Sequence, residues 1–202
     1  MIEHVVTSGT FSLDGGTWEV DNNVWIVGDD TEVVVIDAAH DATAILDVVA
    51  GRRIKAVLCT HAHDDHINAA VLLGAPVRLH PADDVLWRRH YGDGSPYLPL
   101  EDGETIAVGG VELEVSHTPG HSPGAVCLYA ADQGVVFTGD TLFKGGPGAT
   151  GRSFSSFATI MESIETRLLT LPPETVVLTG HGEATTIGAE APHLAEWLAR
   201  GH

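Results

Sequence analysis

Basic residues are scarce in this chain of 202 residues. Ten lysines and arginines stand against 28 aspartates and glutamates, which gives a formal net charge of −18 at pH 7. Such a chain would be repelled by a nucleic-acid phosphate backbone and by an anionic lipid surface. We therefore expect no nucleic acid and no membrane among its partners, and we expect a small molecule as its substrate.

Long apolar runs and cysteines are also lacking. No run reaches eighteen apolar residues, so no membrane span is expected. The segment Met1–His4 lacks a basic region followed by an apolar stretch, which predicts no secretory signal and a cytoplasmic location. The two cysteines, Cys59 and Cys127, lie in apolar runs, which favours free buried thiols over a disulfide. The length predicts a single domain over residues 1–202 with a sizeable core.

The pattern of apolar residues is strand-rich at first and then alternates strands and helices. It predicts strands at 23–28, 32–37, 54–59, 77–80, 111–116, 125–129, 134–138 and 175–178. It predicts helices at 41–49, 68–73, 81–89, 157–169 and 190–200. The segment 144–151 is too rich in glycine for either helix or strand.

Histidine and aspartate gather at the ends of four of these strands. The positions are His61, His63, Asp65 and His66 in one loop, and His121, Asp140 and His181 in three short Gly-rich contexts. Imidazole and carboxylate are ligands for zinc and other divalent first-row metals. Loops at strand ends carry function while the sheets hold them rigid. Five histidines and two aspartates can hold two metal ions with one shared ligand, which predicts a single site for metal-assisted hydrolysis.

The whole chain resembles the metallo-β-lactamase-fold hydrolases, and within them the small glyoxalase II-like (hydroxyacylglutathione hydrolase-like) thioesterases. The resemblance rests on Asp37 at the end of an early strand, the His-x-His-x-Asp-His loop, Pro-Gly-His, Gly-Asp-Thr-Leu-Phe and a late Gly-His-Gly. It implies an α/β (α+β) architecture, the αββα four-layer sandwich, with two metal ions at one edge of the sheets.

The resemblance also implies a role for each residue. His61, His63 and His121 would hold one metal, Asp65, His66 and His181 would hold the other, and Asp140 would bridge them. Zinc is the expected metal, with iron or manganese as alternatives. A hydroxide between the cations would be the nucleophile, and Asp65 would orient it as the catalytic residue. Asp37 would hydrogen-bond the histidine loop and orient it.

A thioester is the expected substrate, because a thiolate leaves without a general acid when the thiol pKa is about 8.5. Lys144 and Arg152 are candidate substrate contacts. The chain ends 21 residues past His181, so we expect no C-terminal helical extension of the kind that grips glutathione in larger glyoxalase II enzymes. Gly151-Arg152-Ser153-Phe154 replaces the Gly-Arg-Thr-Asp of many relatives, which disfavours the usual glutathione-derived substrates. Eight arginines against two lysines indicate a high-GC actinobacterial source and a mycothiol-linked substrate, S-acyl-mycothiol, which carries no carboxylate.

Three alternatives share parts of this pattern. A lactonase has the full ligand set, including the bridging aspartate. A persulfide (sulfur) dioxygenase uses one iron, held by the equivalents of His61, His121 and Asp140. A β-lactamase is disfavoured, because those enzymes have Cys or Ser where Asp140 stands. The sequence carries no signal of oligomeric state.

Overall fold

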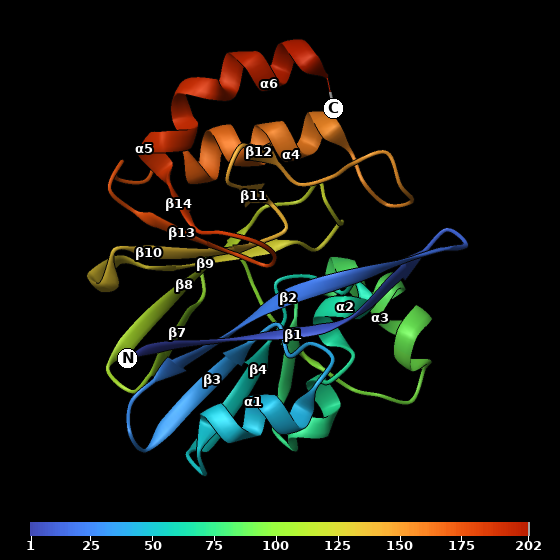
Figure 1. Ribbon diagram of the computed structural model, residues 1–202, viewed down its shortest axis with the longest axis vertical. Coiled ribbons are helices and arrows are strands. Elements are labelled where there is room, and N and C mark those ends of the chain that lie inside the picture. Colours follow the sequence, from blue (N-terminus) through green and yellow to red (C-terminus); the bar gives the residue numbers. More distant parts are fainter. Residues whose placement is uncertain (202) are drawn as a thin grey trace.

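Two six-stranded sheets lie face to face between two layers of helices in the computed structural model, which describes residues 1–201 (Figure 1). The helices of the first half of the chain cover the outer face of one sheet, and those of the second half cover the outer face of the other (Figure 1). This is the expected αββα sandwich, so the predicted fold class is confirmed.

The first sheet is mixed. Its strands in spatial order are β1 (Ile2–Leu13), β2 (Gly16–Gly28), β3 (Glu32–Ile36), β4 (Arg53–Leu58), β5 (Val77–Leu79) and β6 (Leu98–Pro99). The first three pair antiparallel, and β4, β5 and β6 continue the sheet in parallel. The helices on its outer face are α1 (Ala42–Val49), α2 (Asp64–Ile67) and α3 (Asp84–Tyr91), with 3₁₀ turns at Ala70–Leu73 and Pro81–Asp83.

The second sheet is mostly antiparallel. Its strands in spatial order are β14 (Thr185–Thr186), β13 (Val176–Thr179), β10 (Val135–Gly139), β9 (Val126–Ala130), β8 (Val111–His117) and β7 (Thr105–Val108). Only β10 and β13 pair in parallel. Its outer face carries α4 (Phe157–Ser163), a π turn at Ile164–Leu168, α5 (Ile187–Glu190) and α6 (Leu194–Arg200), with 3₁₀ turns at Ala131–Gln133 and Ala191–His193. A small ribbon joins β11 (Leu142–Phe143) and β12 (Gly146–Pro147).

Three apolar clusters separate the four layers, because successive side chains of a strand point to opposite faces. Val33 of β3 packs beneath the helices of the first sheet, whereas its neighbour Val34 packs between the sheets. Val136 of β10 packs toward the second helical layer, whereas Phe137 packs between the sheets. Each fully buried side chain of this size contributes about 1.5–3 kcal/mol. The sheets are therefore buried on both faces and form a rigid frame.

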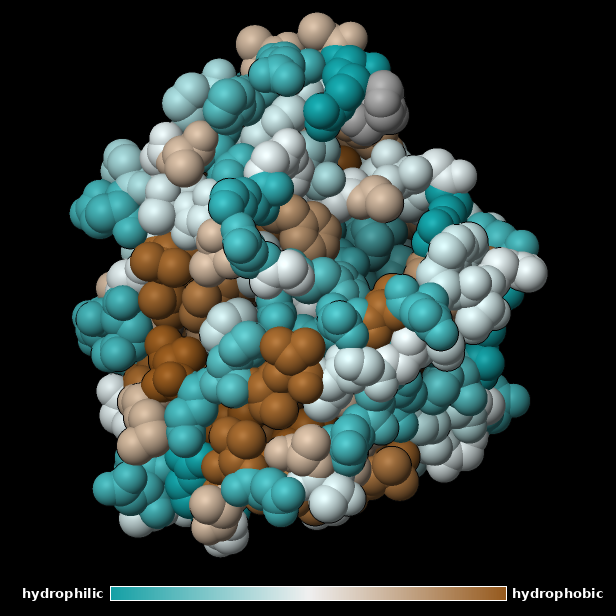
Figure 2. Space-filling model, viewed as in Figure 1, coloured by the Kyte–Doolittle hydropathy of each residue, from teal (hydrophilic) through white to brown (hydrophobic). Residues whose placement is uncertain are grey.

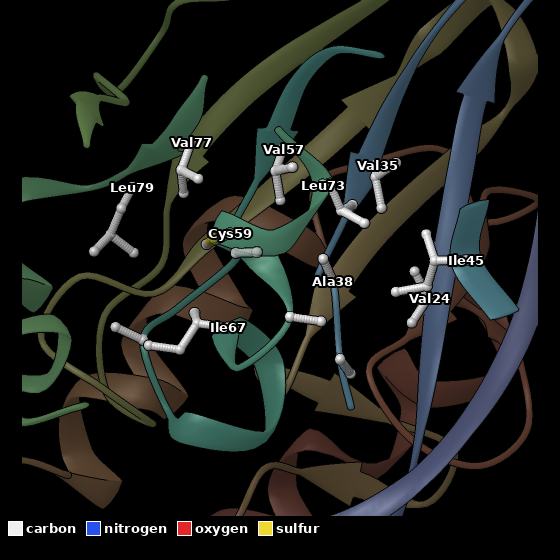
Figure 3. Packing of buried hydrophobic residues seen from close by; sticks show 14 of the residues in the cluster. Val24, Val35, Ala38, Ile45, Val57, Cys59, Ile67, Leu73, Val77 and Leu79 are labelled. Carbon is white, nitrogen blue, oxygen red and sulfur yellow. The ribbon is translucent and has the colours of Figure 1, made fainter. Parts of the chain in front are cut away.

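Helices of the first half are anchored through their apolar sides. Figure 3 shows Ile45 of α1 and Ile67 of α2 in the cluster that also contains Val24, Val35 and Val57 from three strands. Ile45 and Ile67 are fully buried. The short helix that carries two of the predicted ligands is thereby fixed to the first sheet by the buried side chain of Ile67.

The structure differs from the sequence prediction in the N-terminal hairpin and in several short segments. No strand was predicted before residue 23, yet β1 and the first part of β2 form a long hairpin. Residues 146–147 pair with β11 despite their glycine content, so the prediction of no strand in 144–151 is wrong there. The helix expected at 68–73 begins earlier, as α2, and its predicted range holds a 3₁₀ turn instead.

The polarity of the surface agrees with the acidic composition of the chain. Hydrophilic side chains dominate the face of the molecule seen in Figure 2, as expected for a chain with 28 acidic residues. Between residues 1 and 201, no helix has the length and apolar character needed to cross a membrane.

Candidate metal centre

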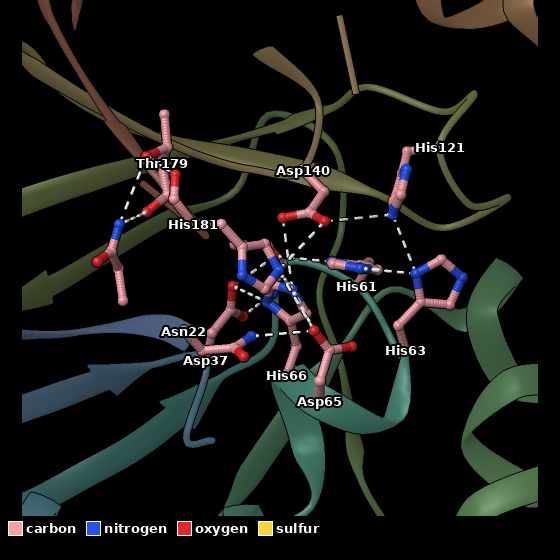
Figure 4. A network of polar contacts seen from close by, with 12 residues as sticks. Asn22, Asp37, His61, His63, Asp65, His66, His121, Asp140, Thr179 and His181 are labelled. Atoms are coloured by element: carbon pink, nitrogen blue, oxygen red, sulfur yellow. Dashed lines mark hydrogen bonds and ion pairs between the residues drawn. The ribbon is translucent and has the colours of Figure 1, made fainter. Parts of the chain in front are cut away.

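All seven predicted ligands converge at one edge of the two sheets. The loops that carry them follow β4, β8, β10 and β13, the four strands expected from the sequence. One of these strands, β4, belongs to the first sheet, and the other three belong to the second, where β10 and β13 are adjacent. Figure 4 shows the seven side chains pointing toward one another from these separate loops.

The first group, called here the His61 cluster, contains His61, His63 and His121. The His61 Nε2 and His121 Nε2 atoms each lie 3.0 Å from His63 Nδ1. All three side chains are buried, and their donor atoms lie within 4.8 Å of one another. Three imidazole nitrogens at this spacing fit the corners of a tetrahedral metal site, whose metal–nitrogen distances are about 2.0–2.1 Å.

The second group, called here the His66 cluster, contains Asp65, His66 and His181. The His66 and His181 Nε2 atoms lie 3.1 Å apart. The Asp65 Oδ2 atom is 3.3 Å from His181 Nε2 and 3.5 Å from His66 Nε2. Asp65 and His66 are neighbours in α2, and one ligand atom of each lies within 4.8 Å of the other and of His181.

Asp140 faces both clusters. Its Oδ2 lies 3.5 Å from His121 Nε2 of the first cluster and 3.5 Å from His181 Nε2 of the second. Its Oδ1 lies 3.4 Å from His66 Nε2. This is the position that a carboxylate bridging two cations would take. The structure therefore brings together all the residues for which the sequence predicted ligand roles.

In three of the histidines, the Nδ1 atom, which faces away from the centre, lies beside an oxygen acceptor. His66 Nδ1 lies 2.9 Å from Asp37 Oδ2, His121 Nδ1 lies 2.9 Å from the Ala149 carbonyl, and His181 Nδ1 lies 2.7 Å from the Asp21 carbonyl. A carbonyl oxygen can only accept, so a neutral ring donates its N–H there and keeps its lone pair on Nε2. The lone pairs of His121 and His181 are thereby directed into the site, as in metal-bound histidines.

A divalent cation fits these residues. Within residues 1–201, the buried Asp140 Oδ1 atom makes no hydrogen bond. A buried carboxylate oxygen that makes no hydrogen bond is costly, and the nitrogen lone pairs that face one another in the His61 cluster have no reason to converge without a cation. The donor set of imidazoles and carboxylates suits zinc, iron or manganese. The groups of His and Asp therefore suggest a dinuclear site for divalent metals.

The two clusters differ in their electrostatics. Burial lowers the pKa of His61 and lowers that of His63 to about 3. Burial also opposes the charge of His66 and His181, but the neighbouring carboxylates outweigh it and raise the pKa of both. The pKa of Asp65 falls to about 2 despite its burial, because His66 and His181 lie beside it. The His66 cluster therefore holds protons that a cation would have to displace.

Asp37 lies behind the site and not in it. Its Oδ1 accepts the Thr60 backbone N–H at 2.7 Å, and its Oδ2 accepts the Thr60 hydroxyl at 2.7 Å as well as contacting His66. The Asp37 backbone has a φ of +54°, a strained conformation for a residue with a side chain. A strained backbone of this kind persists only where the surrounding structure holds it. Here the conformation places the Asp37 carboxylate between Thr60, at the start of the histidine loop, and the His66 ring.

The two predicted substrate contacts have different surroundings. Lys144 is exposed and forms an ion pair of 2.5 Å with Glu183. The Arg152 guanidinium lies over the Trp18 ring at 3.9 Å and near the Phe11 ring at 5.1 Å. Phe11 in turn packs against the His63 ring at 5.0 Å. Arg152 is therefore separated from the His61 cluster by one aromatic side chain.

Two supporting residues were not predicted. Asn22 donates from Nδ2 to Asp65 Oδ2 at 3.1 Å, and nothing in its sequence context marks it. Asp83 is fully buried and accepts the Ala62 N–H and the Ser122 hydroxyl, each at 2.8 Å. It thus joins the loop of His61 to the loop of His121. The sequence predicted it only as part of the helix at 81–89, and in the structure it ends the 3₁₀ turn Pro81–Asp83 and directly precedes α3.

Comparison with known proteins agrees with this geometry. A family model described as the metallo-beta-lactamase superfamily matches residues 17–181. The fold and the centre define a metal-dependent hydrolase. The chain belongs to the metallo-beta-lactamase superfamily, whose members are mostly enzymes of this kind.

Three individual proteins show which members of the superfamily this chain is similar to. The chain is 31% identical over 186 residues to hydroxyacylglutathione hydrolase GloC of Haemophilus influenzae, covering 80% of this chain and 85% of that protein. The crystal structure of TTHA1623 in a di-iron-bound form is similar with a TM-score of 0.76 and 35% identity, over 85% of this chain and 93% of that one. The structure of ETHE1 from Myxococcus xanthus has a TM-score of 0.74 and 27% identity, over 94% of this chain and 83% of that one.

Proposed function

We propose that this chain is a glyoxalase II-like thioesterase, which hydrolyses an S-acyl derivative of a low-molecular-weight thiol, of the S-lactoylglutathione or S-acyl-mycothiol type. The observation that carries the proposal is the position of Asp140 between two complete clusters of three ligands. The likeness to the hydroxyacylglutathione hydrolase of Haemophilus influenzae supports the same reaction class.

In this proposal His61, His63 and His121 hold one divalent cation and Asp65, His66 and His181 hold the second, with Asp140 shared and zinc as the first candidate. When bound, the two cations would polarise the substrate carbonyl and lower the pKa of water. The residues behind the site keep the ligands in place: Asp37 holds His66, and Asn22 holds Asp65.

Asp65 is the residue proposed to orient the attacking water. Its Oδ2 atom is engaged by Asn22 and lies beside His181. The Oδ1 atom is then the one that accepts a hydrogen bond from water and aims its oxygen at the acyl carbon. Asp65 suits this task because the histidines beside it keep its pKa near 2, so the carboxylate stays ionised at neutral pH.

The chemistry of the leaving group favours a thioester. Hydrolysis joins the water oxygen to the acyl carbon and breaks the carbon–sulfur bond, and the sulfur leaves as a thiolate. A thiol pKa of about 8.5 makes that departure feasible without a proton donor. Amide cleavage would need such a donor. The histidines of the centre are proposed metal ligands and so are not free to donate a proton to a leaving group. This favours a thioester substrate over an amide.

A second candidate is a persulfide dioxygenase with one iron held by His61, His121 and Asp140. The similarity to the ETHE1 structure favours it. The complete His66 cluster favours the thioesterase, because a one-iron enzyme has no use for Asp65, His66 and His181 as a second set of ligands.

The test is metal analysis of the purified protein together with a substrate panel. The panel contains S-lactoylglutathione, an S-acyl-mycothiol, a homoserine lactone and glutathione persulfide, the last with an oxygen electrode. Two metals per chain and thioester turnover are expected. One iron with oxygen uptake on the persulfide would establish the dioxygenase instead, and turnover of the lactone alone would establish a lactonase.

A further inference from the structure

A cavity of about 340 Å³ lies beside the His61 cluster. The proposed mechanism gives it no role. It is bounded by the turn of the β1–β2 hairpin, by the loop of His63 and by α3. Its volume is in the range of small-molecule sites. His63 is shared between the cavity and the metal centre, so a molecule that reacts at the centre can extend into the cavity.

Two residues of α3 bring basic character to this cavity. Arg89 and His90 both line it, at the C-terminal end of the helix. The chain has only ten lysines and arginines. Nine of them are engaged in ion pairs, hydrogen bonds, ring contacts or other interactions, whereas Arg89 forms no hydrogen bond or ion pair within residues 1–201. In a chain with a net charge of −18, an arginine that forms no ion pair is an unusual placement.

One polar atom in the inner wall of the cavity also has no hydrogen-bond partner. The Nε2 atom of His63 is buried and makes no hydrogen bond within residues 1–201. Because His63 Nδ1 faces the metal centre, a neutral ring carries its proton on Nε2. Figure 4 shows Nε2 on the side of the ring that faces away from His61 and His121. This N–H needs an acceptor, and an anion in the cavity would supply one.

Two carboxylates lie near the cavity, and both are already engaged. Asp64 lines the wall, where its Oδ1 accepts the Ser12 backbone N–H at 3.0 Å. Asp14 lies at the hairpin turn, where its Oδ2 accepts the Ser153 backbone N–H at 2.9 Å. The hydrogen bonds from Ser153 lower the pKa of Asp14, and the positive charges of Arg89 and Arg152 lower it further.

We propose that the cavity binds a carboxylate group of the substrate, with Arg89 as the residue that selects for it. The proposal rests on the thioesterase function. A guanidinium binds a carboxylate through two parallel N–H···O bonds, which gives both affinity and orientation. The carboxylate can belong to the thiol, as in glutathione, or to the acyl group. With a thiol that has no carboxylate, such as mycothiol, the acyl group would have to supply it.

The first test is kinetic and compares three thioesters. S-acetyl-N-acetylcysteamine is neutral, S-succinyl-N-acetylcysteamine carries a carboxylate on the acyl side, and S-lactoylglutathione carries its carboxylates on the thiol side. Arg89→Ala is expected to raise the ratio of the KM of a charged thioester to the KM of the neutral one by about tenfold, with kcat little changed. The charged thioester that shows the effect identifies the side that enters the cavity.

The neighbouring arginine is the matched control. Arg88 lies on the same helix but pairs with Asp84 at 2.5 Å and Asp93 at 2.8 Å, and it does not line this cavity. Arg88→Ala should leave the KM ratio at its wild-type value, and Arg89→Lys should restore part of it. An unchanged ratio in Arg89→Ala for both charged thioesters would overturn the proposal while leaving the thioesterase function intact.

The second test does not depend on turnover. Calorimetric titration of the metal-loaded protein with succinate and with S-methylglutathione measures binding directly. Wild-type protein should bind at least one of them, and Arg89→Ala should weaken that binding by about tenfold. If no thioester is hydrolysed but this difference is found, the proposed function fails and the anion site stands. Equal binding to wild type and Arg89→Ala, or no binding to either, would refute the anion site.

Discussion

Asp37 and His66 lie 29 positions apart in the chain, and Asp37 Oδ2 lies 2.9 Å from His66 Nδ1. The same carboxylate accepts two hydrogen bonds from Thr60, the residue before His61. One side chain therefore orients a ring of the His66 cluster and fixes the start of the loop that carries the His61 cluster. Partners of this kind hold a metal-binding ring in the correct tautomer as well as in the correct orientation.

Asp37→Asn should weaken metal binding. The amide keeps the shape of the side chain but exchanges one acceptor for a donor, so it cannot satisfy both Thr60 and His66. Loss of a supporting hydrogen bond behind a metal ligand costs about 10–100-fold in affinity. Competition with a chromophoric chelator measures that affinity. The control is Asp41→Asn, because Asp41 caps α1 at an exposed position and should affect helix stability alone. Wild-type affinity in Asp37→Asn would contradict the orienting role.

Asp83→Ala should destabilise the protein even without metal. The buried Asp83 carboxylate accepts the Ala62 and Gly124 backbone N–H groups and the Ser122 hydroxyl. Each buried donor left without a partner costs about 1–3 kcal/mol, so we expect a loss of at least ~3 kcal/mol in the free energy of unfolding. Urea denaturation of the metal-free protein measures it.

The neighbouring carboxylate provides the comparison for Asp83. Asp84 pairs with Arg88 at the surface, so Asp84→Ala should cost no more than about 1 kcal/mol. Equal losses in the two variants would show that the buried bonds of Asp83 do not join the two loops. A further expectation is that Asp83→Ala lowers the metal affinity of the His61 cluster, because that cluster draws its ligands from both loops.

Metal occupancy should depend on pH differently at the two clusters. The pKa of His63 lies at about 3 and that of His61 is also lowered, so both rings are already neutral at pH 6. The pKa of His66 and of His181 is raised by Asp65 and Asp140, so those rings keep protons at a pH where a free imidazole, with a pKa of about 6.5, loses them. A cation must displace these protons, so binding at the His66 cluster weakens as pH falls.

Titration of the metal-free protein with cobalt(II) should therefore give a stoichiometry that declines from two toward one as the pH falls through the raised pKa of His66 and His181, which lies above the value of about 6.5 of a free imidazole. The absorption spectrum of bound cobalt(II) follows the loss. The variant His181→Ala removes a ligand of the His66 cluster and should show one site with little pH dependence over this range. Loss of both sites together, at the same pH in the wild-type protein, would contradict the assignment of protons to the His66 cluster.

The convergence of the candidate ligands could be predicted because each position is local. A histidine or aspartate that directly follows an apolar strand is placed by that strand, and four strand ends at one edge of a layered sheet must meet. The support behind the ligands is not local. Asn22 reaches Asp65 across 43 positions, and Asp83 reaches Ser122 across 39. Such pairs follow from how the loops pack in three dimensions, and no spacing in the sequence reveals them.

The N-terminal hairpin has its clearest sequence signal in its turn, Asp14-Gly15. Asp14 and Gly15 have φ values of +53° and +80°, and an Asp-Gly pair with both residues in this region is typical of a two-residue hairpin turn. The flanking strands are rich in Ser, Thr and Gly, and much of β1 is exposed, so their apolar alternation is weak. The turn, rather than the strands, was the informative feature, and it forms part of the wall of the cavity beside His63.

Gly180→Ala should remove a metal without removing a ligand. A Cβ atom at Gly180 would lie 2.5 Å from Asp140 Oδ1 and 2.7 Å from His66 Cε1. The backbone at Gly180 is not in the left-handed region, so an alanine is opposed by these contacts alone. Asp140 and His66 must move apart to admit the methyl group, and a shift of this size is incompatible with metal–ligand distances that vary by about 0.2 Å. We expect a folded protein that binds fewer than two metals.

Elemental analysis gives the stoichiometry for Gly180→Ala, and circular dichroism shows whether the fold is kept. Gly94→Ala is the matched control, because a Cβ atom there meets nothing within 4 Å and the backbone is not left-handed. The control should bind the same number of metals as the wild-type protein. Two metals bound to Gly180→Ala with wild-type affinity would mean that Asp140 is free to move. Such freedom would contradict a bridging role, because both clusters depend on the position of this one carboxylate.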